Sequence, residues 1–308
     1  EADNFAIRQV IDCHNIKTVI SSKIEHHAVE MTLLELEKKG IIKILWVKLD
    51  NKGNVDLDNL EELLINNPNS LVSLMHANNE IGTLLPLEKV GTLCKQHGAF
   101  FHTDTVQTVG HLPLKLKEWN INFISCGAHK FHGPKGVGFI YISNDSKITP
   151  FIHGGSQERN MRGGTENLTG IVGLSKAMEI CYSHMEEHRQ HIQSLKTRMI
   201  ESLQKCFPDM KFNGETGSEN SLYTVLNCSF PPHPDAEMLL FNLDIAGICA
   251  SGGSACTSGS NQGSHVLMGI GADMKRPSVR FSFCKYNTAD EIDFVVNKLV
   301  EIFGKSQK

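Results

Sequence analysis

A lysine that follows an apolar run is the residue with the clearest potential for chemistry. Lys130 comes shortly after the strand-like segment 121–125, in the order Ser-Cys-Gly-Ala-His-Lys. Apolar neighbours can remove the charge of a lysine by desolvation, and the neutral amine is a nucleophile that forms a Schiff base with an aldehyde. The alternative is an exposed lysine at a surface turn, which is the more common environment of this residue type.

A second apolar run is followed by polar side chains that complement such an amine. Asp104 and Gln107 come after the segment 99–102, in the order His-Thr-Asp-Thr-Val-Gln. An aspartate can pair with the protonated ring nitrogen of pyridoxal phosphate, which the ring needs to act as an electron sink, and Gln107 could hydrogen-bond the phenolic oxygen of the ring. Asp104 could equally cap a helix that begins near Val106.

Two further strand ends carry candidate residues. Asn79 follows the segment 71–76 and is a candidate donor, although Asn-Asn before a glycine region is also ordinary turn chemistry. His26 and His27 follow the segment 17–22, where an imidazole could stack on a planar cofactor. Adjacent histidines do not match the ligand spacings of zinc sites, so no metal site is predicted, and His27 could simply be a polar residue at a helix start.

Cys256 differs from the other cysteines in its surroundings. It lies in the Gly/Ser-rich stretch 251–260, whose small side chains suit a segment that moves, and an exposed thiolate there would be a nucleophile. The nine cysteines are odd in number and contain no C-x-x-C pair, which indicates buried thiols of a reducing compartment rather than disulfides or a zinc ribbon. The alternative for Cys256 is an inert cysteine in a surface loop.

Alternating apolar segments must position these residues. Strands are expected at 17–22, 41–49, 71–76, 99–102, 121–125 and 137–142, and helices at 27–39, 58–65 and 87–97. Repeated βαβ spacing predicts an α/β fold with a largely parallel sheet and helices on both of its faces. Functional groups of such folds lie at the carboxyl ends of the strands, where the candidates above are found.

The pattern changes in the second half of the chain. Long helical sequence is expected over 167–207, followed by a smaller α+β region with strands at 223–228 and 279–283 and helices at 236–242 and 290–303. We therefore expect a large domain over residues 1–186 and a small C-terminal domain over residues 187–308.

Composition excludes several classes of protein. The 308 residues have a formal net charge of −4, without the basic excess of a nucleic-acid-binding protein. No uninterrupted apolar run reaches the length of a membrane span, and the start of the chain lacks the features of a signal peptide. A cytoplasmic protein is the expectation, and the absence of an initial Met suggests that a preceding segment has been lost or removed.

Seven motifs in succession resemble the cysteine desulfurases, which are fold-type I pyridoxal-phosphate enzymes related to the class V aminotransferases. The motifs cover residues 22–29, 75–82, 102–107, 128–138, 154–167, 251–259 and 276–282. The resemblance extends over essentially the whole chain and points to the branch that serves iron–sulfur cluster assembly and nitrogenase maturation. It implies a large sheet-containing domain and a smaller C-terminal domain that carries a mobile cysteine loop.

The resemblance also implies roles for individual residues around the cofactor. Lys130 would bind pyridoxal phosphate covalently, Asp104 would face the ring nitrogen, and His26 would stack on the ring. The remaining contacts would come from Asn79 and Gln107 at the ring oxygen, from His129 at the phosphate, and from Thr165 at the phosphate of the other subunit of a homodimer.

The implied reaction converts L-cysteine to L-alanine. Arg280 would bind the substrate carboxylate through a planar fork of hydrogen bonds, although a salt bridge at a strand edge is the alternative for this residue. Cys256 would take the sulfur as a persulfide and pass it to an acceptor or scaffold protein. A selenocysteine lyase, and an impaired remnant that dimerises or binds a partner, are the rival interpretations.

Three positions depart from the family pattern. The family has a phosphate-binding Gly-Ala-Thr turn directly before the residue that corresponds to Glu1, and this turn is not in the sequence. Gly127 stands where the family usually has a serine, and Cys284-Lys285 replaces a Gly-Arg pair. The first departure would weaken cofactor affinity and folding, whereas the other two affect details of the site.

Overall fold

The computed structural model describes residues 1–217, 219–233, 238–252 and 263–304, and these residues divide into two compact units. The first unit comprises Glu1–Leu49, Val55–Ala77 and Leu85–Met185. The second unit comprises Asp50–Asn54, Asn78–Leu84 and Glu186–Lys308, so two short segments of the first half group with the C-terminal part. The sequence did not predict that regrouping.

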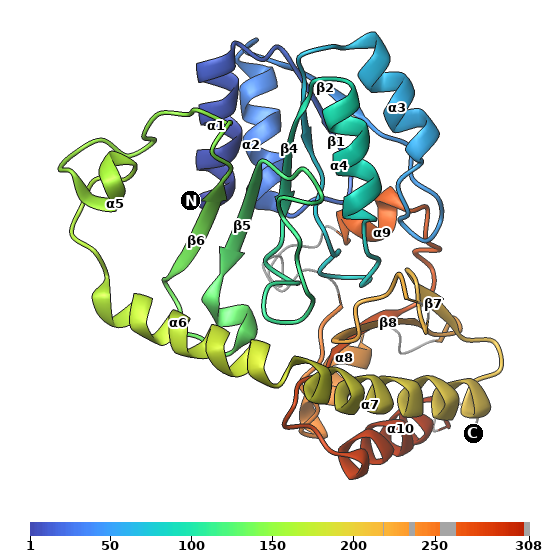
Figure 1. The fold of residues 1–308 in the computed structure, drawn as a ribbon. Helices are drawn as coiled ribbons and strands as arrows, with labels where there is room; N and C mark the ends of the chain where they lie inside the picture. Colours follow the sequence, from blue (N-terminus) through green and yellow to red (C-terminus); the bar gives the residue numbers. More distant parts are fainter. Residues whose placement is uncertain (218, 234–237, 253–262, 305–308) are drawn as a thin grey trace. The chain divides into compact units, whose positions relative to one another are not determined.

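A mixed sheet forms the centre of the first unit (Figure 1), and among the described residues it has six strands in the order β2-β1-β3-β4-β5-β6. The strands are β1 (Thr18–Ser21), β2 (Lys43–Trp46), β3 (Leu71–Ser73), β4 (Phe100–Asp104), β5 (Phe123–Gly127) and β6 (Gly138–Ile142). Strands β1 to β5 are parallel and β6 is antiparallel to β5. The predicted α/β class with a mainly parallel sheet is confirmed.

Helices cover both faces of this sheet, as predicted (Figure 1). The helices of the first unit are α1 (Ala2–His14), α2 (His27–Lys38), α3 (Leu57–Asn66), α4 (Leu87–Gln96), α5 (Gln157–Asn160) and α6 (Leu168–Ser183), with a short 3₁₀ helix η1 (Ala128–Phe131). Side chains alternate between two core clusters along each strand, because successive strand residues point to opposite faces. Val19 packs with α1 and α2, for example, whereas Ile20 packs with α3 and α4.

Two elements differ in form from the sequence expectation. The segment 137–142 forms an antiparallel strand because the connection from β5 is a short turn around η1, which is too short for the crossover that a parallel strand requires. The helical sequence 167–207 forms two helices, α6 and α7 (Met185–Cys206), which are separated at His184.

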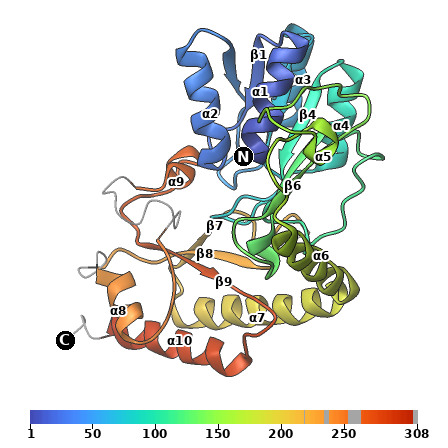
Figure 2. The same cartoon turned by 90° about the vertical axis from the view of Figure 1, so that its left-hand side faces the viewer.

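The second unit contains an antiparallel sheet in the order β7-β8-β9, and β8 and β9 lie side by side in Figure 2. Its strands are β7 (Lys211–Asn213), β8 (Val225–Ser229) and β9 (Ser278–Ser282), and β7 was not predicted. Its helices are α7, α8 (Leu239–Ile245), α9 (His265–Gly269) and α10 (Ala289–Gly304). No helix within the described residues has the length and apolar character needed to cross a membrane.

Candidate active site

The carboxyl ends of the five parallel strands form one edge of the large sheet, which we call the carboxyl edge. In the register of the sheet, Ser21 lies opposite Ser73, Ser73 lies opposite His102, and Asp104 lies opposite Ser125. Segments that leave β1, β4 and β5 at this edge carry five predicted site residues, namely His26, Asp104, Gln107, His129 and Lys130. The topology therefore gathers residues that are more than one hundred positions apart in the chain.

Asp104 is the last residue of β4, and its side chain is only 6% exposed. Burial raises the pKa of Asp104 well above its usual range, and the acidic groups of Asp3 and Glu25 raise it further, while Lys130 lowers it. The backbone N–H of Val106 donates to Asp104 Oδ1 at 2.8 Å, so the capping interaction that the sequence suggested as an alternative is also formed. That single hydrogen bond is compatible with a second partner at the carboxylate.

These residues fit pyridoxal phosphate. A buried carboxylate among other acidic groups is stabilised by a cationic partner, and a protonated pyridine nitrogen is such a partner. The same sheet edge supplies the amine of Lys130, the imidazole of His26 and the amide of Gln107. An amine, a carboxylate, an imidazole and an amide are the groups that the aldehyde, ring nitrogen, ring face and phenolic oxygen of this cofactor require.

Helix η1 presents His129 and Lys130 while its other two residues anchor it. Ala128 and Phe131 are fully buried, and the thiol of Cys181 in α6 donates to the backbone oxygen of Phe131 at 3.5 Å. Gly110 has a positive φ of 79°, and a Cβ at this position would lie 2.8 Å from the Cβ of Phe131, so only glycine permits this approach.

Lys130 itself is exposed, which is the alternative that the sequence offered. The apolar neighbours Ala128 and Phe131 bury their own side chains in the core and leave the lysine outside. Partial burial lowers the pKa of His129, and the nearby ammonium groups of Lys130 and Lys135 lower it further. A neutral His129 imidazole keeps a nitrogen lone pair and one N–H donor.

His26 caps the N-terminus of α2. Its Nδ1 accepts a hydrogen bond from the backbone N–H of Ala28 at 3.1 Å, and this contact assigns the proton of the neutral imidazole to Nε2. His27 is the first residue of α2, and its Nδ1 lies 3.1 Å from Glu30 Oε2. His27 is therefore the polar helix-start residue that the sequence offered as its alternative.

Asn79 and Arg280 lie together in the second unit. Arg280 is in β9, and its Nη1 donates to the backbone oxygen of Asn79 at 2.9 Å. The backbone of Arg280 also pairs with that of Ser251, with N–O distances of 2.6 and 3.2 Å. The structure thus joins two predicted residues through a guanidinium–carbonyl contact rather than through the amide side chain of Asn79.

The structure does not test the roles of three other predicted residues, Thr165, Gln107 and Cys256. Thr165 is exposed in the first unit, and Gln107 is half-buried three residues after Asp104. Cys256 lies outside the described residues. Their roles at the phosphate, the ring oxygen and the substrate sulfur stay predictions.

Sequence reasoning missed a buried polar network beneath the carboxyl edge. His102 Nε2 lies 3.4 Å from Asp3 Oδ1 and 3.2 Å from Ser125 Oγ, and its Nδ1 lies 2.9 Å from Ser73 Oγ. Burial acts to raise the pKa of Asp3, but the side chains of His102 and Ser125 act to lower it and the net shift is downward. Polar residues inside otherwise apolar strands were the signal that could have revealed this network.

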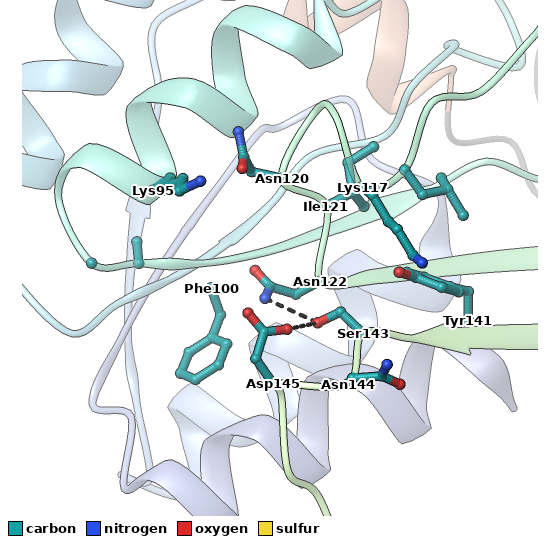
Figure 3. Close-up of a pocket in the computed structure, with 13 residues that line it drawn as sticks. Lys95, Phe100, Lys117, Asn120, Ile121, Asn122, Tyr141, Ser143, Asn144 and Asp145 are labelled. Carbon is teal, nitrogen blue, oxygen red and sulfur yellow. Dashed lines mark hydrogen bonds between the residues drawn. The ribbon is translucent and has the colours of Figure 1, made fainter.

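A hollow of about 600 Å³ lies at the opposite edge of the sheet, which we call the amino edge (Figure 3). Its lining includes Phe100 at the start of β4, Asn122 just before β5 and Tyr141 near the end of β6. Asn122 and Asp145 are both hydrogen-bonded to Ser143 Oγ, at 3.3 and 2.6 Å. None of the predicted site residues that the structure describes lines this hollow.

Comparison with known proteins agrees with the sheet-edge arrangement. Residues 1–295 match the Aminotransferase class-V family. The chain is 42% identical over 312 residues to "Cysteine desulfurase IscS" of Clostridium botulinum, a match that covers 100% of this chain and 78% of the relative. The chain belongs to the class V aminotransferase family, among the cysteine desulfurases.

Other members of the family give consistent results. "Cysteine desulfurase IscS" of Dictyoglomus turgidum is 40% identical over 309 residues, covering 99% of the chain and 77% of that protein. The solved structure of a NifS-like protein has a TM-score of 0.88 at 36% identity and covers 98% of this chain and 80% of its own. The NifS-like protein of Rickettsia africae has a TM-score of 0.85 at 29% identity, with coverage of 98% and 79%.

Proposed function

We propose that the chain is a pyridoxal-phosphate-dependent cysteine desulfurase that converts L-cysteine to L-alanine and transfers the sulfur to Cys256. The observation that carries the proposal is the buried Asp104 at the same sheet edge as the exposed Lys130 of η1. A carboxylate for a ring nitrogen and an amine for an aldehyde at one edge match the activity named for the relatives.

Each residue of the carboxyl edge has a task in this reaction. Pyridoxal phosphate, when bound, supplies an electron sink for the electron pair released at the substrate Cα. Lys130 holds the cofactor and later accepts the Cα proton on its Nζ atom. Asp104 keeps the ring nitrogen protonated, since its carboxylate is buried and is stabilised by a positive partner. His26 packs on the ring face, and its Nδ1 accepts from the backbone N–H of Ala28.

Further residues orient the cofactor and the substrate. Gln107 and Asn79 hydrogen-bond the phenolic oxygen, and His129 binds the phosphate together with Thr165 of the partner subunit in a homodimer. Arg280 holds the substrate carboxylate, which a guanidinium binds through two parallel hydrogen bonds.

Cys256 performs the sulfur transfer. Its thiolate attacks the sulfur of the substrate, so that an S–S bond forms while the C–S bond breaks and the carbon fragment, once protonated, leaves as alanine. The persulfide then passes its sulfur to an acceptor protein for iron–sulfur cluster or other thio-cofactor synthesis. The cytoplasm, as predicted from the sequence, is the compartment in which we place this reaction.

Measurement of alanine after incubation of the purified chain with pyridoxal phosphate and L-cysteine tests the proposal. The C256S variant should retain the absorbance of the bound cofactor and lose persulfide formation. Sustained sulfur release by this variant would contradict the role of Cys256. Parallel turnover of selenocysteine distinguishes a desulfurase from a selenocysteine lyase, which would use the selenium substrate alone.

A further inference from the structure

The carboxyl group of Glu25 connects the segment after β1 to the segment after β3. Glu25 is 1% exposed, and its Oε2 and Oε1 accept from the backbone N–H of Met75 at 3.0 and 3.2 Å. The hydroxyl of Ser22 donates to Glu25 Oε1 at 2.6 Å. Because β1 and β3 are neighbours in the sheet, this side chain joins two adjacent strand ends at the carboxyl edge.

This connection lies directly before His26. On the other side of His26, its backbone oxygen accepts from the N–H groups of Val29 and Glu30, and its Nδ1 accepts from that of Ala28. The backbone of His26 is therefore held by α2 on its C-terminal side and by Glu25 on its N-terminal side. Loss of the Glu25 contact would remove the N-terminal one of these two supports and so change the direction of the imidazole.

The protonation of Glu25 favours this structural task over an electrostatic one. Burial raises the pKa of Glu25 to about 8, although hydrogen bonds from Ser22 and Met75 lower it, and the acidic groups of Asp3 and Glu30 add to the increase. At neutral pH the group is mostly an uncharged acid, so glutamine is its closest mimic. The Oε1 atom of a glutamine can still accept from Met75 N–H and from Ser22.

We infer that Glu25 is a positioning residue for His26, which it orients toward the cofactor ring by fastening the turn after β1 to the end of β3. The role at the ring rests on the proposed function, whereas the anchor itself is a property of the protein without cofactor. A variant that breaks the anchor should therefore disturb His26 before any cofactor is added.

The anchor is tested in cofactor-free protein by NMR. In E25A, amide hydrogen exchange of Met75 should become at least about tenfold faster, because its N–H loses a buried acceptor, and the ring signal of His26 should shift. In E25Q the exchange rate of Met75 should stay within about twofold of the wild type, and the ring signal of His26 should not shift, since the acceptor is retained. The matched control is E35A, which removes a surface carboxylate of α2 that is paired with Lys39 at 2.9 Å.

The effect on the ring is tested with cofactor bound. E25A and H26A should both lose about half or more of the circular dichroism of the cofactor band while its absorbance persists, because an aromatic neighbour of fixed orientation contributes to that signal. H26A should leave Met75 exchange unchanged, which separates the anchor from the imidazole. Normal Met75 exchange and an unshifted His26 signal in E25A, or equal damage by E25Q and E25A, would overturn the inference.

Two further outcomes have defined meanings. If E25A does not fold, S22A replaces it, and a shift of the His26 signal in S22A supports the anchor while an unchanged signal opposes it. If the wild-type protein binds no cofactor, the proposed function fails, and the cofactor-free NMR comparison still decides whether Glu25 positions His26.

Discussion

The two edges of the large sheet contain the same strands and differ in chemistry. At the carboxyl edge, Asp104 is buried and its pKa is raised, first by that burial. At the amino edge, Asp145 is exposed beside the hollow, and the Ser143 hydroxyl lowers its pKa. The polar residues Lys117, Asn144 and Asp145 of the hollow are exposed, whereas the carboxyl edge contains buried acidic groups whose pKa values are raised. Buried titratable groups are therefore the better guide to chemistry in this protein.

Removal of Lys130 from the carboxyl edge should cause the largest loss of activity. K130A removes the amine that holds the cofactor and moves the Cα proton, so alanine formation should fall by at least about a thousandfold. The characteristic absorbance of the covalently bound cofactor should disappear as well. K117A, which removes an exposed lysine of the amino-edge hollow, is the control and should retain both. A large loss in K117A would contradict the assignment of the two edges.

Neutralisation of one aspartate at each edge should give the next largest difference in rate between the two edges. D104N removes the partner of the ring nitrogen, and we expect alanine formation to fall by about a hundredfold, comparable to the loss of one preorganised electrostatic contact. D145N should leave the rate within about twofold, since Asp145 accepts a hydrogen bond from Ser143 Oγ at the amino edge and not at the carboxyl edge. Steady-state rates of alanine formation measure both, and equal rates for D104N and wild type would exclude the proposed pairing.

The dependence of the free energy of unfolding on pH should reveal the raised pKa of Glu25. Its pKa is about 8 in the folded chain against 4.5 as the ordinary value, so the folded state binds more protons between these pH values and stability falls as pH rises through them. E25Q should remove this dependence, a difference on the order of a few kcal/mol between pH 5 and pH 8. Urea unfolding of the cofactor-free protein at these pH values measures it. An unchanged pH slope in E25Q would mean that Glu25 titrates normally.

Lys196 tests whether burial of a charged group marks a catalytic site by itself. This lysine of the second unit is 1% exposed, and its Nζ donates to Ser221 Oγ and to Leu222 O at 2.7 and 2.8 Å. Burial lowers the pKa of Lys196 to about 8, so stability should rise with pH between about 8 and 10.5. K196M should lose this rise and about 1–3 kcal/mol of stability at pH 7, while the rate per folded molecule stays within about twofold.

A rate loss in K196M that exceeds its loss of folded protein would show that Lys196 contributes to the reaction. Circular dichroism of the folded fraction, measured in parallel with alanine formation, separates the two effects. The carboxyl edge combines buried titratable groups with an exposed amine, and the expected difference between K130A and K196M follows from that combination.

Local patterns in the sequence predicted the strands of the large sheet and most of its helices, whereas β7 and α1 were not predicted. The segment 99–102, just before Asp104, and the segment 121–125, before Lys130, were recognised as strands, and parallel pairing then places both residues at one edge. The motifs also identified the family, because they combine residue types that the cofactor and substrate require.

Tertiary structure decided what depends on contacts between distant residues. The sequence left open whether Lys130 would be desolvated or exposed, and the fold makes it exposed because its apolar neighbour Phe131 packs against α6 and Gly110. The polar residues inside the strands indicated a buried network, but the sequence did not show that Asp3 would lie beside His102, or that Glu25 would bind the backbone of Met75. Periodicity and spacing report which faces of an element are apolar, whereas burial, protonation and hydrogen-bond partners depend on what the fold brings next to each side chain.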